Sequence, residues 1–269
     1  MLPNSVFATE NGDIFVDNSL IKRRIEKWIP NQTNSTTVML VDHFCFAIFI
    51  DMNNTIYCSL RDLNRIDKKY LGSGLLNDTQ TVIGINGFGI TIGSLWGPHG
   101  IFIPADYSIY VADCYNHRIQ RFEKDTLNAS ILAGDGAPST ISLLYPTGVI
   151  LDGHGYIFIV DCWHHRIVAS GQNGFRCLAG CNGIGNSVSQ LSTPTSMAFD
   201  SYGNIFVADS SNGRVQKFFL ASNSCSKYRN FLCLSAINLT FFSLLKSRFF
   251  ESTKVLSVCF LGDKCNHFG

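Results

Sequence analysis

Hydrophobic residues in this chain fall in short runs separated by turn-forming residues. The unit between Pro146 and Gly180 shows the pattern most clearly. Polar or glycine-rich turns lie at 152–155, 161–165 and 171–174. The strand-like runs between them are 149–151, 156–160, 166–169 and 175–179. Runs this short, rich in β-branched and aromatic residues and bounded by Gly and Asp, predict four β-strands per unit.

The unit recurs along the chain with a period of 48 residues. A proline opens each copy, an aspartate follows it by 15 residues, and an arginine follows the aspartate by five. These landmarks are Pro98, Pro146 and Pro194; Asp113, Asp161 and Asp209; and Arg118, Arg166 and Arg214. Two degraded copies precede them, at about residues 5–25 and 46–66. Five units of four short strands are typical of a repeat protein built from propeller blades.

The shared motif resembles the NHL repeat. It reads Pro-x-Gly-Val, then Asp-x-x-Gly-x-Ile-x-Val-Ala-Asp-x-x-Asn-x-Arg-Ile-x-x-Phe, and covers about residues 5–225. The Asn-His-Leu triplet that names the family is altered to Asn116-His117-Arg118 in the best copy. The resemblance implies an all-β fold, a β-propeller of NHL-type four-stranded blades. Five recognisable units predict a six-bladed or incomplete ring, with five blades as the alternative.

The segment 226–269 shows no blade landmarks, and we treat it as a divergent tail distinct from the propeller at 1–225. We expect it to be less ordered than the blades and removable with little loss of the fold. Its apolar runs leave a second interpretation open, in which the tail supplies strands to a closing blade. Truncation at Cys225 would then expose a strand edge and cause aggregation.

The repeated acid and base favour architecture over catalysis. Asp113, Asp161 and Asp209 are expected to accept backbone N–H bonds from the turn that follows each of them. Arg118, Arg166 and Arg214 begin the returning strands and are expected to pair with a nearby acid. A catalytic carboxylate would occur once, whereas this pair recurs in each clear unit. We therefore predict a structural role for all six residues and no catalytic residue among them.

Peptidyl-glycine amidating lyases share the propeller that the resemblance implies, and in that family a His after the blade-opening Pro holds zinc in several blades. Here Pro98-His99-Gly100 is similar to that element. The equivalent residues in the next two units are Thr147 and Thr195, and Thr does not replace an imidazole ligand. We therefore expect no metal and no other cofactor, and we expect the chain not to be an enzyme.

Ten cysteines are many for a cytosolic protein of 269 residues. Cys177 and Cys181 flank a short segment with glycines beside it, so a local disulfide is one interpretation and two buried small residues the other. Cys114 and Cys162 occupy equivalent places in adjacent units, too far apart to pair with each other. Sequons with Ser or Thr at the third position add candidate N-glycosylation sites at Asn31, Asn34, Asn53, Asn77, Asn128 and Asn238. Together these features favour an extracellular protein or ectodomain, with the cytoplasm as the alternative.

Charge adds little to this interpretation. Lys plus Arg total 21 and Asp plus Glu total 20, so no general attraction to nucleic acid or anionic membranes follows. The most apolar run, 231–245, is shorter than a membrane span and carries polar residues. The variable loops between repeated strands indicate a binding or scaffolding surface for a protein, peptide or glycan. The alternative is the substrate- or RNA-recruiting propeller of NHL-type ubiquitin ligases; the lyase is less favoured.

Overall fold

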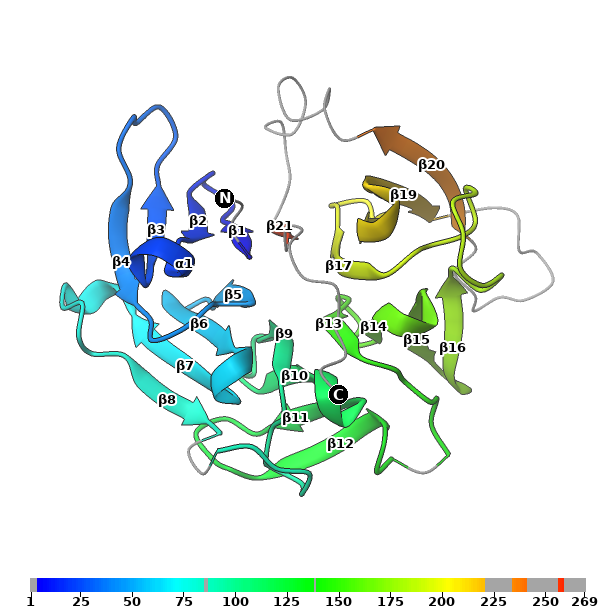
Figure 1. Cartoon of the computed structure of the whole chain (residues 1–269), viewed down its shortest axis with the longest axis horizontal. Coiled ribbons are helices and arrows are strands. Elements are labelled where there is room, and N and C mark those ends of the chain that lie inside the picture. Colours follow the sequence, from blue (N-terminus) through cyan, green and yellow to red (C-terminus); the bar gives the residue numbers. More distant parts are fainter. Residues whose placement is uncertain (1–3, 85–86, 138, 221–233, 241–255, 259–269) are drawn as a thin grey trace.

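Five antiparallel sheets, four of them with four strands and one with five, form the blades of a propeller around a common centre (Figure 1). The structure is a computed structural model, and it describes residues 4–84, 87–137, 139–220, 234–240 and 256–258. The predicted all-β propeller is confirmed. The described residues form five blades, so the six-bladed ring expected from the unassigned tail is corrected to five.

Each blade is a meander in which successive strands pair, and the first strand lies nearest the ring centre. Blade 1 also contains α1 (Ser19–Lys22), which joins its second and third strands. The blades are β1 (Val6–Ala8), β2 (Ile14–Asp17), β3 (Arg24–Trp28), β4 (Thr36–Leu40); β5 (Ala47–Ile50), β6 (Thr55–Leu60), β7 (Arg65–Tyr70), β8 (Gln80–Ile83); β9 (Pro98–Phe102), β10 (Ile109–Asp113), β11 (Arg118–Phe122), β12 (Ala129–Gly134); β13 (Pro146–Leu151), β14 (Ile157–Asp161), β15 (Arg166–Gly171), β16 (Gly174–Ala179); and β17 (Pro194–Phe199), β18 (Ile205–Asp209), β19 (Arg214–Leu220), β20 (Leu234–Thr240).

The 48-residue period maps directly onto the blades. The three predicted strands at 109–112, 157–160 and 205–208 are β10, β14 and β18, the second strand of blades 3, 4 and 5. In each case the last residue of the strand is the repeated Asp, and its partner across the ladder is the repeated Arg. Equal spacing in sequence therefore produces equal positions in space.

Apolar side chains from neighbouring blades interlock to form the core. Phe7 of blade 1 packs on Phe49 of blade 2 with ring centroids 5.4 Å apart, and Phe49 packs on Phe102 of blade 3 at 5.3 Å. Phe158 and Phe199 repeat this contact between blades 4 and 5 at 4.9 Å. A blade buries its apolar faces only against its neighbours, so stability depends on the stacking of blades.

Two strands of the tail pair with the propeller. β20 is the fourth strand of blade 5, paired with β19 from Leu220↔Leu234 to Arg214↔Thr240. β21 (Leu256–Val258) pairs antiparallel with β1 and lies beside β17. Figure 1 shows β21 between the first and last blades. These backbone pairings correspond to the second interpretation of the tail, in which it contributes to closing the ring.

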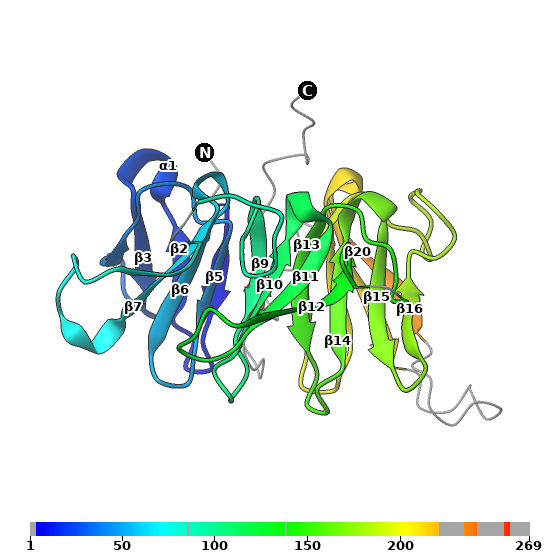
Figure 2. The same ribbon diagram turned by 90° about the horizontal axis from the view of Figure 1, so that it is seen from below.

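Antiparallel pairing gives the propeller two distinct faces (Figure 2). One face, which we call the loop face, carries the connections between the second and third strands and those that lead from each fourth strand to the next blade. α1 lies on this face. The opposite face, the turn face, carries the connections between the first and second strands and between the third and fourth strands.

Truncation after Cys225 is predicted to damage the fold. It removes β20 and β21, leaving the ladder edge of β19 without its partner and removing the strand paired with β1. We expect the truncated chain to melt at a lower temperature than the full chain and to elute as aggregates in size-exclusion chromatography. A monodisperse truncated chain with unchanged melting would mean that the tail is dispensable.

Candidate functional site

The repeated Asp is the centre of a buried polar network at the base of the loop face. The side chains of Asp113, Asp161 and Asp209 have no solvent exposure. In each, Oδ2 accepts from the Nε of the repeated Arg, at 2.8, 2.8 and 2.7 Å respectively. Oδ1 accepts the backbone N–H of Trp96, Leu144 or Ser192, at 2.6–2.7 Å.

One expected detail is corrected by these contacts. Each Asp was expected to accept from the turn that follows it, but its Oδ1 partner lies 17 residues earlier, in the loop that enters the blade. The carboxylate therefore ties the incoming loop to the second and third strands. Local turn chemistry predicts the short-range bond, and only the packing of the loop against the blade provides the longer-range donor.

The repeated Arg extends this network along the loops. The guanidinium of Arg118 donates to the carbonyls of Ile90, Thr91 and Ser94, at 2.8–3.1 Å. Arg214 donates in the same way to the carbonyls of Asn186, Ser187 and Gln190, at 2.6–2.9 Å. One charged side chain thus fixes the described part of the 84–97 loop, residues 87–97, and another fixes the 180–193 loop. In blade 4 the loop is shorter, and Arg166 contacts the single carbonyl of Ser142.

The two long loops expose the same pair of apolar positions. Phe88 and Ile92 are 69% and 62% exposed, and Ile184 and Val188, which lie two repeats further on, are 59% and 53% exposed. The buried Leu95 and Leu191 anchor the base of the loops through parallel bridges to Phe88 and Ile184. Because the loop carbonyls are engaged by Arg and the leucines are buried, the apolar tips point to solvent from a fixed backbone.

A row of aromatic rings runs along the loop face from the 84–97 loop across blades 3 and 4. The ring centroids of Phe88 and Trp96 are 6.1 Å apart, and Tyr115 lies 5.9 Å beyond Trp96. Tyr145 is 5.9 Å from Tyr115 and 5.4 Å from Trp163. The rings come from two inter-blade loops and two strand connections, so no local sequence pattern indicates the row.

The backbone is strained where the inter-blade loops enter blades 4 and 5. Tyr145 and Thr193 have φ of +49° and +43°, where the preceding blade has Gly97 at +62°. A left-handed conformation is unfavourable for bulky or β-branched residues and persists only where surrounding structure fixes it. His117 and His165 fix it here, because their Nδ1 atoms accept the backbone N–H of Tyr145 and Thr193 at 3.1 and 3.0 Å.

A family model describes two of the blades. The NHL repeat model matches residues 95–122 and 191–218, which span the ends of the two long loops, the first three strands of blades 3 and 5, and their Asp–Arg pairs. Two blades of this propeller therefore match the NHL repeat. Comparison with curated protein sequences gives no match.

Solved structures share the propeller fold of this chain at low sequence identity. A streptogramin B lyase superposes with a TM-score of 0.57 and 11% identity, over 91% of this chain and 71% of that one. A catalytically inactive virginiamycin B lyase from Staphylococcus aureus with quinupristin gives 0.58 and 11%, over 90% and 70%. A nidogen/laminin complex gives 0.55 and 19%, over 79% and 72%.

These structures correct the expectation that the chain is not an enzyme. That expectation rested on the repeat architecture, and solved structures with the same architecture include lyases. At 11% identity the likeness concerns the fold alone and assigns no reaction to this chain.

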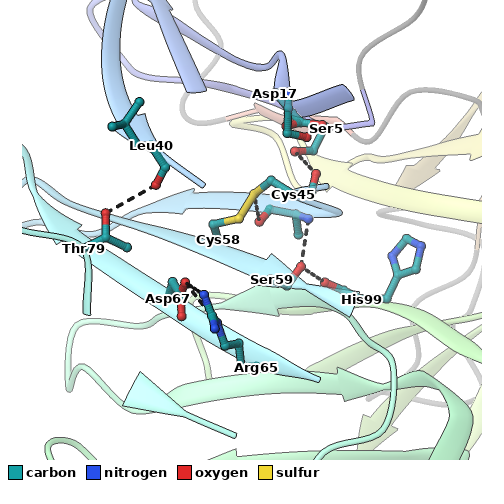
Figure 3. The surroundings of a disulfide bond; sticks show 12 residues. Ser5, Asp17, Leu40, Cys45, Cys58, Ser59, Arg65, Asp67, Thr79 and His99 are labelled. Atoms are coloured by element: carbon teal, nitrogen blue, oxygen red, sulfur yellow. Dashed lines mark hydrogen bonds and ion pairs between the residues drawn. A yellow bond between two sulfur atoms is a disulfide. The ribbon is translucent and has the colours of Figure 1, made fainter. Parts of the chain in front are cut away.

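His99 lies on β9, immediately after the opening proline, as the sequence indicated. Its ring packs against Phe46 with centroids 5.2 Å apart, and its carbonyl accepts from Ser59 Oγ (Figure 3). Thr147 and Thr195 occupy the equivalent places on β13 and β17. Within the described ranges, no three His, Cys, Asp or Glu side chains gather as metal ligands would.

The structure contains two disulfides among its described residues. Cys177–Cys181 joins the end of β16 to the start of the 180–193 loop, so it cross-links the base of the loop that carries Ile184 and Val188. Cys45–Cys58 links the loop that precedes the first strand of blade 2 to its second strand, and both residues are fully buried (Figure 3). No sequence pattern indicates this pair, because blade 2 lacks the repeat landmarks that would place two cysteines on neighbouring segments. Cys114 and Cys162 are buried and take part in neither disulfide.

The remaining predicted positions lie away from the loop face. Asn31, Asn34, Asn53, Asn77 and Asn128 are all exposed on turns, whereas the side chain of Asn238 lies outside the described residues. No helix in the part of the chain that the structure covers has the length and apolar character needed to cross a bilayer.

The substitution Asp161→Asn is predicted to destabilise the fold. An amide cannot accept from Arg166 and His164 as a carboxylate does, and it leaves a partly buried guanidinium without its counter-charge. We expect the free energy of unfolding in denaturant titrations to fall by about 3 kcal/mol. The matched control is Asp152→Asn in an exposed turn, where the acceptor oxygen is retained and a change within about 0.5 kcal/mol is expected. Equal effects of the two substitutions would contradict the structural role.

The stability of the loop face is predicted to depend on pH through His117 and His165. Burial lowers the pKa of both imidazoles below the usual value. As the pH falls below about 6.5, the unfolded chain therefore takes up these protons before the folded one does. The contribution of the neutral rings is complete above about pH 6.5 and is lost as the pH falls toward the folded pKa.

We expect the melting temperature to decline between about pH 7 and pH 5. In the double substitution His117→Gln and His165→Gln, the amide oxygens can still accept but do not titrate, so the decline should be shallower. A double variant with the same pH profile as the original protein would exclude the histidines as its cause.

Proposed function

We propose that this NHL propeller binds an apolar segment of a protein partner on its loop face. The observation that carries the proposal is the recurrence of exposed apolar pairs, Phe88 with Ile92 and Ile184 with Val188, at the tips of two equivalent loops. Monomeric proteins rarely expose clustered large apolar side chains without a binding role.

The loops are suited to binding because their backbone is fixed in advance. Arg118 and Arg214 engage three carbonyls in each loop, and Cys177–Cys181 closes the base of one of them. A preorganised loop loses little conformational entropy when a partner docks, so more of the contact energy contributes to affinity.

The chemistry of the face favours a protein over a glycan. Beside the aromatic Phe88, the exposed large apolar residues of the two loop tips are aliphatic: Ile90, Ile92, Ile184 and Val188. These four side chains supply apolar contact but not the charged hydrogen-bonding groups with which sugars are held. Trp96, Tyr115 and Tyr145 beside them are of the types enriched at the centres of protein interfaces.

Selection from a display library of short random peptides tests the proposal. Immobilised full-length protein is expected to enrich peptides rich in apolar and aromatic residues. The paired substitution Phe88→Ala and Ile92→Ser should weaken the binding of enriched peptides by at least about tenfold, which is ~1.4 kcal/mol.

The matched control replaces exposed apolar residues of the turn face, Met52→Ser with Tyr202→Ser, and should leave peptide affinity unchanged. Because all four side chains are exposed, both variants should melt close to the original protein. Equal loss in the two variants, or no enrichment, would contradict binding at the loop face.

A further inference from the structure

The five sequon asparagines with described side chains lie on the same face of the propeller. Asn31 and Asn34 are in the hairpin between β3 and β4, and Asn53 is in the turn between β5 and β6. Asn77 lies between β7 and β8, and Asn128 between β11 and β12. All of these connections belong to the turn face. Figure 2 shows the cyan connection after β7 on the side away from α1.

The loop face has asparagines of its own, but their sequence context differs. Asn64, Asn116, Asn182, Asn186 and Asn212 lie in its connections, and none of them has Ser or Thr two positions later. The same holds for Asn4 and Asn18, so no described asparagine of this face is an acceptor. The sequon asparagines and the asparagines of the loop face are therefore separated by the length of a strand, because successive connections in a blade lie on opposite faces.

The sequons also coincide with exposed apolar surface. Met52, Leu76 and Leu127 are exposed large apolar residues, and each immediately precedes a sequon asparagine. The exposed Ile29 stands two residues before Asn31. On the loop face the exposed apolar tips have no acceptor beside them. In blades 1 to 3, these apolar groups of the turn face therefore lie where an attached glycan would cover them, and the apolar tips of the loop face do not.

We propose that the turn face of blades 1 to 3 is N-glycosylated at Asn31 or Asn34 and at Asn53, Asn77 and Asn128. The glycans cover its apolar residues and leave the loop face as the open apolar surface. This inference goes beyond the proposed partner binding and does not require it. The two disulfides favour the oxidising secretory route in which such modification takes place.

The acceptor side chains are placed for the transfer. The side-chain nitrogen of Asn forms a C–N bond to C1 of a lipid-linked oligosaccharide pyrophosphate; the C–O bond to the pyrophosphate breaks, the lipid pyrophosphate leaves, and the amide loses one proton. All five asparagines are exposed. Asn53 and Thr55 line an open cavity of about 540 Å³, which gives the first sugar room beside the chain. The Asn128 amide donates to Glu123 Oε2 at 3.3 Å on the surface, a contact that a sugar would replace.

Mapping occupied sites tests the proposal directly. The full chain is secreted from animal cells, folded protein is purified, and peptide-N-glycosidase treatment in heavy-oxygen water marks each occupied asparagine for mass spectrometry. We expect label at Asn53, Asn77, Asn128 and at least one of Asn31 and Asn34. Folded protein lacking label at any of these four positions would overturn the proposal. Because no partner is involved, this outcome is separate from the peptide-binding result.

A second measurement tests what the glycans cover. Enzymatic removal of glycans from the folded protein should cause a severalfold rise in the fluorescence of an apolar-surface dye and promote association. Met52→Ser with Leu76→Ser and Leu127→Ser should suppress the rise, whereas Ile92→Ser with Val188→Ala on the loop face should not affect it. Dye fluorescence that does not change on deglycosylation would overturn the covering role, and the use of native folded protein avoids variants that fail to fold.

Discussion

The buried carboxylate of the repeated Asp is the constraint on which the blades depend. A carboxylate without solvent exposure is costly unless hydrogen bonds and a counter-charge surround it. In blade 3, Asp113 meets this requirement with the backbone N–H of Trp96, the Nε of Arg118, and the amides of Asn116 and Gln120. The donors come from an incoming loop, a tight turn and a returning strand, so satisfying one charge fixes three segments.

The loop face follows from that network. Arg118 and Arg214 each use Nε for the Asp and the rest of the guanidinium for loop carbonyls, so the charge that stabilises the blade also holds the loop. Apolar tips on such loops cannot collapse onto the surface without breaking charge-assisted hydrogen bonds. The same architecture recurs in lyases and in a nidogen/laminin complex, which agrees with a fold whose scaffold is constant and whose loops carry the chemistry.

The two faces of the propeller are different surfaces made by one meander. Connections alternate between the faces, so residues close in sequence but on successive turns are separated by the full length of a strand. Exposed apolar tips without acceptors collect on one face, and sequons next to apolar residues collect on the other. A partner that approaches the loop face meets aromatic and aliphatic side chains on a fixed backbone, away from the sequon asparagines.

The sequence alone determined the five repeat units, the position of the second strand in blades 3 to 5, and the five-residue spacing of Asp161 and Arg166 across a turn. These features depend on local alternation and on a spacing of five residues across one tight turn, which fixes partners whatever surrounds them. The sequence also indicated Cys177 and Cys181 as a candidate disulfide, because cysteines only four residues apart can pair locally.

Only the tertiary structure decided what crosses between blades. An aromatic row forms because consecutive blades place different connections side by side; its rings are Trp96, Tyr115, Tyr145 and Trp163. The spacing of these residues in the sequence does not indicate that they are neighbours. The Cys45–Cys58 bond, the donor 17 residues before each Asp, and the strands that the tail adds to blades 5 and 1 are likewise non-local. Whether Phe88 is buried or exposed depends on how its loop packs, and a sequence fixes that only through the whole fold.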